Sequence, residues 1–152
     1  MSGDEYMDNQ MNLTIQRMYA MRKLFEACNQ PVCDKYGISQ TEAVILLFLH
    51  NNPENDTASD IVEYRYIPKA NVSKSVESLF IKGFLERKNY TNDRRKIHLT
   101  LTEQAIPCAE ELFASCVKYV QILFDGFTDE EKMLYDRMNT KLADNAAKGL
   151  QR

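Results

Sequence analysis

Residues 68–101 read PKANVSKSVESLFIKGFLERKNYTNDRRKIHLTL, and within this stretch the spacing of the apolar residues changes. From Pro68 to Lys82 the spacing is helical. One face of this helix is apolar and is expected to be buried: Val72, Val76, Leu79 and Phe80. Proline suits the first turn of a helix, and Gly83 suits the position just after its end. Beyond Gly83 the apolar residues alternate, which predicts two short strands, FLERKNY and KIHLTL, joined by TNDRR.

Three other helices begin with a capping box. In this motif the first hydroxyl accepts a hydrogen bond from the backbone N–H three residues later, and the acid at that later position accepts one from the N–H of the first residue. The boxes are Ser39-x-x-Glu42, Thr57-x-x-Asp60 and Thr128-x-x-Glu131. The first opens an apolar helix that runs to Leu49, and the second opens a short helix that runs to Arg65. The short helix, the helix 68–82 and the basic hairpin together predict a winged helix-turn-helix.

Long helices are predicted at both ends of the chain. The first runs from about Tyr6 to Asn29 and is apolar on more than one side, so more than one neighbour must cover it. A core helix explains this pattern as well as a dimer helix does. Two further helices, from Thr102 and from Thr128, each carry an apolar stripe. The predicted fold class is mostly α with a small β-hairpin wing, in a single domain spanning residues 1–152.

Charge is unevenly distributed along the chain. The net charge is −3, but residues 65–98 carry nine basic and three acidic side chains, whereas the rest carries ten and nineteen. An acidic body with one basic face attracts and orients a polyanion, and repels it elsewhere. This distribution favours nucleic acid as a partner, although a solvated lysine-rich face explains the charges equally well.

The start of the chain and its hydropathy favour a cytoplasmic protein. The residues MSGDEYMDNQ are acidic and polar, the reverse of the basic and then apolar start of a signal peptide. No stretch approaches the roughly 18 uninterrupted apolar residues that a membrane span needs. We therefore expect no membrane partner.

Composition and motifs favour a protein that is not an enzyme. The spacing of the cysteines matches no common zinc site, and the chain has two histidines. In a reducing cytosol all four cysteines are expected to be small buried hydrophobic residues: Cys28, Cys33, Cys108 and Cys116. No glycine-rich phosphate loop and no nucleophile–base motif is present. We therefore expect no metal, no cofactor and no catalytic residue.

Two segments resemble the MarR family of winged helix-turn-helix transcription regulators. They are ANVSKSVESLFIKGFLER (70–87) and NDRRKIHLTLTE (92–103), and FTDEE (127–131) resembles the opening of the last helix of the family. The second segment is the more specific, because an Asp-Arg-Arg wing tip runs into Leu-Thr-Glu at a helix start. The resemblance implies a DNA-binding lobe at about 35–101 and long N- and C-terminal dimerisation helices at about 5–33 and 102–150, intertwined between two copies.

The resemblance also implies which residues meet double-stranded DNA. The helix 68–82 of each subunit would enter a major groove, and each wing an adjacent minor groove. The matching positions are Thr57, Ser59, Lys69, Asn71, Ser73, Lys74, Asp93, Arg94 and Arg95. Their chemistry agrees, because lysine and asparagine bind base edges, hydroxyls at a helix start suit phosphates, and arginine suits a narrow minor groove. In this mapping Asp93 is the usual partner of Arg95.

The chain departs from the family pattern in three places. Tyr66 stands where the family often has a glycine in the helix-turn-helix turn, so the turn must close in another way, and Arg65 beside it is a candidate phosphate contact. Pro107 falls early in a family helix, so the regular helix either begins there or is kinked. The glycine that follows Leu-Thr-Glu in the family is missing.

The sequence therefore predicts a homodimeric, sequence-specific transcription regulator, a ligand-responsive repressor acting on an inverted-repeat operator. A small aromatic effector is a further expected partner. Ordinary core packing is the favoured interpretation of the aromatic residues that are candidates for its pocket: Tyr6, Tyr19, Phe25, Tyr36 and Phe48. Two alternatives stay open: a redox-sensing regulator that uses Cys28 or Cys33, and a winged-helix protein-interaction module without operator specificity.

Overall fold

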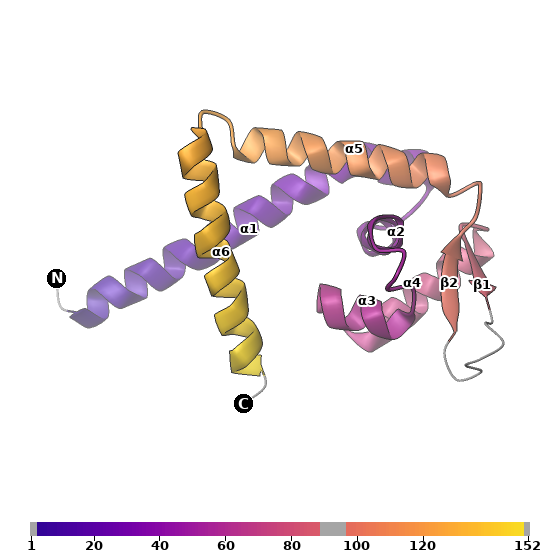
Figure 1. Ribbon diagram of the computed structural model, residues 1–152, viewed down its shortest axis with the longest axis horizontal. Helices are drawn as coiled ribbons and strands as arrows, with labels where there is room; N and C mark the ends of the chain where they lie inside the picture. Colours follow the sequence, from indigo (N-terminus) through magenta and orange to yellow (C-terminus); the bar gives the residue numbers. More distant parts are fainter. Residues whose placement is uncertain (1–2, 89–96, 151–152) are drawn as a thin grey trace. The chain divides into compact units, whose positions relative to one another are not determined.

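The computed structural model describes residues 3–88 and 97–150, apart from the side chains of residues 3–9. Over these residues the chain is mostly helical with a two-stranded antiparallel hairpin, so the predicted fold class is confirmed (Figure 1). The elements are α1 (Gly3–Tyr36), α2 (Gln40–Asn51), α3 (Ala58–Arg65), α4 (Lys69–Ile81), β1 (Leu85–Lys88), β2 (His98–Leu101), α5 (Ile106–Leu123) and α6 (Asp129–Leu150). The chain divides into two compact units, Met1–Tyr119 and Val120–Arg152.

The first helix is longer than the apolar spacing predicts. It continues past Asn29 through Pro31 to Tyr36, although a proline inside a helix removes one backbone hydrogen bond. The added turns place Val32 and Cys33 in the core, where they are 7% and 2% exposed, and this burial outweighs the loss. The helix ends at Gly37, whose φ is +63°, and the Ile38 N–H donates to the Cys33 carbonyl at 3.0 Å.

Helix α2 is the centre of the first unit. It contacts α1, α4 and β2, and Figure 1 shows α3 and α4 on one side of it and the first turns of α5 on another. Ile45 and Leu46 on this helix are 0% exposed. The core therefore forms around α2, and the buried cluster also includes residues of α1, α3, α4, α5 and both strands.

The helices of the helix-turn-helix begin and end close to the positions that their capping residues predict. The capping boxes of α2 and α3 are confirmed, and Pro68 is the N-cap of α4, one residue outside the helix. At the other end of α4 the Gly83 N–H donates to Phe80 and the Phe84 N–H to Leu79, at 3.0 and 2.9 Å. This Schellman arrangement turns the chain directly into β1.

The hairpin packs one face onto the lobe. Leu85 lies opposite Leu101 and Arg87 opposite Leu99, and both Leu85 and Leu99 are 4% exposed. The Leu99 N–H also donates to the Asp56 carbonyl at 2.7 Å, so the base of the hairpin is joined to the chain just before α3. The strands as described are shorter than the predicted ones, and residues 89–96 lie outside the described part of the chain.

The helix predicted from Thr102 begins at Ile106 instead. The Thr102 hydroxyl donates to the Gly83 carbonyl at 2.7 Å and holds residues 102–105 as a turn. Pro107 then falls in the first turn of α5, where its missing N–H costs nothing, so the helix begins there. In the second unit α6 follows the third capping box, which is confirmed by bonds of 2.8 and 3.2 Å between Thr128 and Glu131. Every helix in the described ranges is too short or too polar to cross a membrane.

A buried carboxylate links the start of α2 to the end of α4. Glu42 is 3% exposed; it accepts a bond from the Ser39 N–H at 2.6 Å, and both its oxygens accept from Lys82 Nζ at 2.9 Å. Burial alone would raise the pKa of Glu42, but hydrogen bonds from Ser39, Ser78 and Lys82 outweigh it and hold the pKa below its usual value. Glu42 is therefore ionised in the folded protein at neutral pH.

Glu42→Gln should lower the free energy of unfolding at neutral pH by about 2 kcal/mol, because an amide cannot replace the charge-assisted bonds to Lys82. Since the folded pKa lies below the unfolded one, this stabilisation is present above the unfolded pKa and is lost as the pH falls through the folded pKa. Urea unfolding at neutral pH and at about pH 3 should therefore show a difference between the proteins that shrinks in acid.

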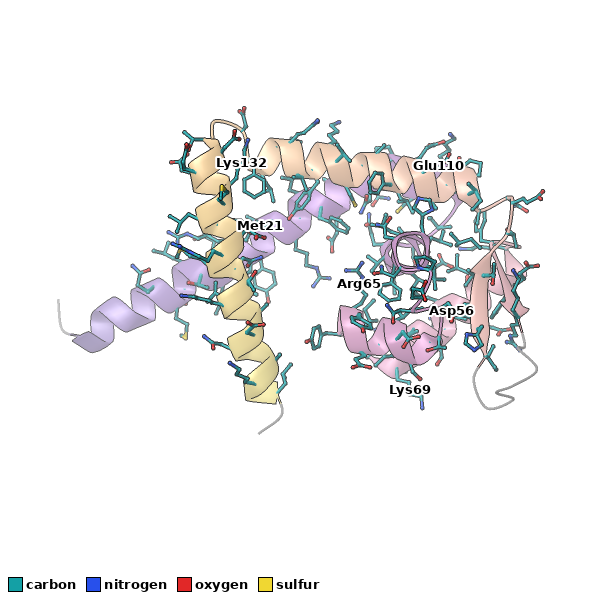
Figure 2. The ribbon with its side chains drawn as sticks, in the orientation of Figure 1. Met21, Asp56, Arg65, Lys69, Glu110 and Lys132 are labelled. Atoms are coloured by element: carbon teal, nitrogen blue, oxygen red, sulfur yellow. The ribbon has the colours of Figure 1, made fainter. Side chains whose placement is uncertain are left out.

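The control for this prediction is Glu110→Gln, at an exposed position of α5 labelled in Figure 2. It should change the unfolding free energy by less than about 0.5 kcal/mol at either pH. An equal loss in Glu42→Gln at both pH values would show that the effect is one of packing and not of charge.

Candidate nucleic-acid interface

Helix α4 buries one face and exposes the face that carries the predicted contacts. Val72 and Leu79 are 0% exposed and Val76 is 8%, while Phe80 is only partly buried, with the Arg87 guanidinium 4.6 Å over its ring. The four predicted contact residues of this helix are all exposed: Lys69, Asn71, Ser73 and Lys74. Figure 2 shows Lys69 on the outer side of α4. The helix thus presents cationic, amide and hydroxyl groups to the outside.

The exposed residues of α4 belong to two different clefts. Lys69 and Ser73 line a cleft of about 200 Å³ against α3, together with Ser59. Asn71 and Lys74 line another cleft of about 370 Å³, against the start of α2. The structure therefore brings Ser59, Lys69 and Ser73 together and places Asn71 and Lys74 on the adjoining side of the same helix.

The side chain of Thr57 forms hydrogen bonds within the protein, at the start of α3. Its hydroxyl donates to Asp60 Oδ2 at 2.6 Å and accepts from the Asp60 N–H at 3.2 Å, as the N-cap of α3. Thr57 therefore caps the start of α3, whereas the exposed Ser59 in the first turn carries the hydroxyl that lies beside α4.

The base of the wing is attached to α3. His98 Nδ1 lies 2.5 Å from Asp56 Oδ1, and His98 pairs with Thr57 as an isolated β-bridge. Asp56 and Thr57 immediately precede α3, so the base of the hairpin is joined to the start of the helix-turn-helix. The predicted wing residues Asp93, Arg94 and Arg95 lie outside the described residues.

Part of the basic charge counted in residues 65–98 is used within the lobe. Lys82 bonds the buried Glu42, and Arg87 lies 3.3 Å from Glu77. The guanidinium of Arg65, the candidate phosphate contact, lies 5.1 Å over the Phe48 ring. The charge count therefore overstates the basic face, and Lys69 and Lys74 are its exposed cations on α4.

The turn between α3 and α4 closes with Tyr66 in the left-handed conformation. Its φ and ψ are 52° and 30°, and its N–H donates to the Val62 carbonyl at 3.0 Å. Tyrosine thus adopts the conformation for which the family often uses glycine, at a cost of about 1–2 kcal/mol for an L-residue with a Cβ. This is how the turn closes without a glycine.

A cleft of about 410 Å³ lies beside this turn, and we call it the turn cleft. Its walls include residues of α1, α2, the turn and α4: Arg22, Phe25, Gln40, Arg65, Tyr66 and Asn71. Figure 2 shows Arg65 at the end of α3, on the side that faces α1. Sequence patterns missed Arg22 and Gln40 and singled out Tyr66 only as a residue of the turn, because residues from separate elements meet here only in the tertiary structure.

The aromatic residues considered for a pocket do not form one group. Phe25 lines the turn cleft, whereas Phe48 is 2% exposed in the core. The Tyr36 ring lies 6.3 Å from the Phe84 ring, and its hydroxyl donates to Glu111 at 2.8 Å. Tyr19 is 63% exposed, and the side chain of Tyr6 lies outside the described ones.

The cysteines pack against the lobe to different extents. Cys33 and Cys108 are buried, as expected, but Cys28 and Cys116 are only half-buried. Burial raises the pKa of Cys108 to about 11, with a further contribution from Cys33. Burial also raises the pKa of Cys33, reinforced by Asp34, and that of Cys116. These three thiols are therefore protonated at neutral pH and are poor nucleophiles.

The arrangement defines a class of protein. A short helix, a tight turn and a second helix with an exposed polar face, joined to an antiparallel hairpin at its base, form a winged helix-turn-helix. The MarR family model matches residues 36–96. Transcriptional regulator ZitR from Lactococcus lactis subsp. cremoris is 33% identical over 110 residues, which cover 70% of this chain and 74% of ZitR. The chain belongs to the MarR family, whose members are transcriptional regulators and not enzymes.

Other proteins are similar to this chain in sequence or in fold. The transcriptional repressor YetL from Bacillus subtilis is 23% identical over 103 residues, 67% of this chain. The chain spans 62% of the length of YetL and 63% of that of a second Bacillus subtilis regulator, YwhA. A MarR family regulator from Listeria monocytogenes, complexed with 26mer DNA, is 18% identical with a TM-score of 0.79 over 90% of this chain and 89% of that one. BpsR from Bordetella bronchiseptica, whose DNA binding is regulated by 6-hydroxynicotinic acid, is 22% identical to this chain. Its structure has a TM-score of 0.69, and the match covers 88% of this chain and 98% of BpsR.

Thiol reactivity should follow these environments. Iodoacetamide at neutral pH should leave Cys33 and Cys108 unmodified in the folded protein, because both thiols are buried and their pKa values are raised. All four cysteines should react in denaturant, as peptide mass spectrometry would show. Mild peroxide should likewise leave DNA affinity intact. Rapid alkylation of Cys33 in the native protein, or a loss of DNA binding that dithiothreitol reverses, would contradict this prediction.

Proposed function

We propose that the protein is a homodimeric, sequence-specific DNA-binding repressor that responds to a small aromatic ligand. The observation that carries the proposal is the exposed face of α4, where lysine, asparagine and serine side chains stand opposite a largely buried apolar stripe. A helix with this face, held by a turn and flanked by a hairpin, suits insertion into a major groove. The structural relative from Listeria monocytogenes, which is complexed with 26mer DNA, supports the same partner.

Each polar residue has a proposed role in that complex. Asn71 and Lys74 read base edges, because an amide pairs with adenine and an ammonium with the acceptors of guanine. Lys69, Ser59 and Ser73 bind the phosphates beside the cleft between α3 and α4. Thr57 caps the N-terminus of α3, and a helix N-terminus favours an anion.

The wing is proposed to reach the adjacent minor groove. The sequence between the two strands contains two arginines and one acid, Asp93, Arg94 and Arg95, which we propose to be its DNA contacts. Arg95 enters the groove because a flat, weakly hydrated cation tolerates desolvation there, and Asp93 orients it. The attachment of the hairpin base to Asp56 and Thr57 supports a wing that keeps a constant position relative to α4.

Unpartnered apolar residues on the terminal helices support a homodimer. On α1, Met11 and Met18 are 56% and 62% exposed. None of the described residues of α6 is buried, and its Met133, Met138 and Leu142 are 74%, 55% and 67% exposed. Leaving so much apolar surface in water is unfavourable, so we propose that a second copy covers these faces.

Repression and ligand response are proposed from the relatives and from the turn cleft. YetL is named a repressor, and BpsR is regulated by 6-hydroxynicotinic acid. The turn cleft is within the usual volume of small-molecule sites and touches α4 through Asn71. A ligand there lies next to the DNA-reading helix, so binding and release of DNA can be coupled to it.

The two alternatives make different predictions from this proposal. A redox sensor needs a thiolate, and the raised pKa values of Cys33, Cys108 and Cys116 oppose one at those sites. A winged-helix module that binds protein has no operator, so unrelated DNA would compete as well as any selected sequence does.

Selection of bound fragments from a random DNA pool by the purified protein should enrich an inverted repeat. The two-fold axis of a dimer imposes half-sites about one helical turn, roughly 34 Å, apart. Sedimentation should show a dimer at micromolar concentration. A monomer in solution together with no enriched motif would refute the proposed function, and an enriched direct repeat would refute the dimer geometry.

Lys74→Ala and Asn71→Ala should each weaken operator binding by about 1–3 kcal/mol, as expected for the loss of a bidentate base contact, and should relax the preference at one base pair. Fluorescence anisotropy with operator and scrambled DNA measures both effects. Lys118→Ala, at an exposed position of α5 outside the lobe, should leave both unchanged. Wild-type discrimination in both α4 variants would assign base reading to another surface.

A further inference from the structure

The polar face of α4 extends beyond the residues proposed to contact bases. Four residues of this helix line the cleft against the start of α2 that Glu42 also lines: Asn71, Lys74, Ser75 and Ser78. Side chains three, four and seven positions apart lie on one side of a helix. The residues proposed to read bases therefore share one face of α4 with the residues that meet α2.

Glu42 holds the C-terminal end of this face. Both of its oxygens accept from Lys82 Nζ at 2.9 Å, and a hydrogen bond from Ser78, four residues earlier, also reaches it. The carboxylate is in turn held by the Ser39 N–H of its own capping box at 2.6 Å. Two groups from the end of α4 are thus bound to a single carboxylate that α2 keeps in place.

Apolar packing and hydrogen bonding constrain α4 in different ways. On its opposite face Val72 and Leu79 are 0% exposed, and their burial holds the helix against the lobe. Hydrophobic burial is non-directional, whereas a hydrogen bond weakens steeply when its angle is lost. The bonds to Glu42 therefore fix the rotation of α4 about its own axis. This rotation decides where Asn71 and Lys74 point.

Lys82 also decides which cation meets Glu42. Lys74 lines the same cleft as Glu42, and among the residues that the structure describes its ammonium has no carboxylate within 4.0 Å. A buried carboxylate without a partner is costly, so removal of Lys82 favours a bond between Glu42 and Lys74. With Lys82 in place the charge of Glu42 is satisfied, and Lys74 stays available to DNA.

We infer that Glu42 and Lys82 are positioning residues for base reading, because the pair sets the rotation of α4 and keeps Lys74 from turning to Glu42. This inference rests on the proposed regulator function and deepens it, since it makes sequence discrimination depend on two residues that bind each other and not a base. A pair with a structural role alone changes stability. A positioning pair also changes the ratio of operator affinity to affinity for scrambled DNA.

The first test is fluorescence anisotropy of the full chain with the selected operator and with scrambled DNA, below the Tm of every variant. Glu42→Gln, which keeps the size of the side chain, should lower operator affinity about fivefold and leave affinity for scrambled DNA within about twofold. Lys82→Met should lower operator affinity by about tenfold or more, because Lys74 is then drawn to Glu42. Lys82→Arg, which keeps a cation for the carboxylate, should stay within about threefold of the wild type.

A rescue and a control separate positioning from stability. The double variant Glu42→Gln/Lys82→Met should bind the operator better than Lys82→Met does, because it has no buried charge to attract Lys74. Leu112→Ala is the control, since it removes a buried side chain from α5, on another side of α2 from α4. It should lower the Tm without changing the ratio of the two DNA affinities.

The second test uses no DNA. In urea unfolding, Lys74→Ala should have the same midpoint as the wild type, because Lys74 is exposed. The double variant Lys74→Ala/Lys82→Met should have a lower midpoint than Lys82→Met alone. This coupling reports the bond between Lys74 and Glu42 that forms when Lys82 is absent.

The outcomes are distinct. Wild-type discrimination in both Glu42→Gln and Lys82→Met overturns the inference, as does an equal loss of discrimination in Leu112→Ala. Additive midpoints in the unfolding experiment refute the competition for Lys74. If Lys82→Met does not fold, the comparison of Glu42→Gln with Lys82→Arg decides. If no operator is selected, the regulator function fails, and the unfolding experiment still decides whether Lys82 keeps Lys74 from Glu42.

Discussion

The burial of α2 on almost every side is the constraint on which the rest of the lobe depends. An enclosed helix must satisfy its first amides inside the protein, and here Ser39 and Glu42 do so in a capping box. The box places a carboxylate where 3% of the residue is exposed, and such a charge requires a cation. Lys82 supplies it from the end of α4, so the same requirement that closes the start of α2 also joins the end of the exposed helix to it.

Helix α4 is also held by the hairpin that follows it and by the turn that precedes it. Gly83 turns the chain into the hairpin, and the hairpin returns to Asp56, just before α3. Tyr66 then closes the remaining gap between α3 and α4 in a strained conformation. The helix-turn-helix is thus held by contacts at both ends of α4, and its turn is the strained part of the arrangement.

The count of basic residues in the sequence predicted a basic segment correctly but did not show which of those residues are available at the surface. The excess of basic residues in 65–98 is real, but Lys82, Arg87 and Arg65 contact groups of the lobe itself. Lys69 and Lys74 carry the basic character of α4. Counting charges cannot separate the two uses, because the separation depends on which side chains meet after folding.

The sequence by itself determined the elements whose cause is local. Capping boxes, the glycine that ends α4 and the change of apolar period depend on residues a few positions apart, and they predicted α2, α3, α4 and the hairpin. The extension of α1 through Pro31 and the late start of α5 depended on burial of Val32 and on the Thr102 bond to Gly83, neither of which is local. The turn cleft and the division of the α4 residues between two clefts were decided by tertiary structure alone, because their walls come from elements far apart in the chain.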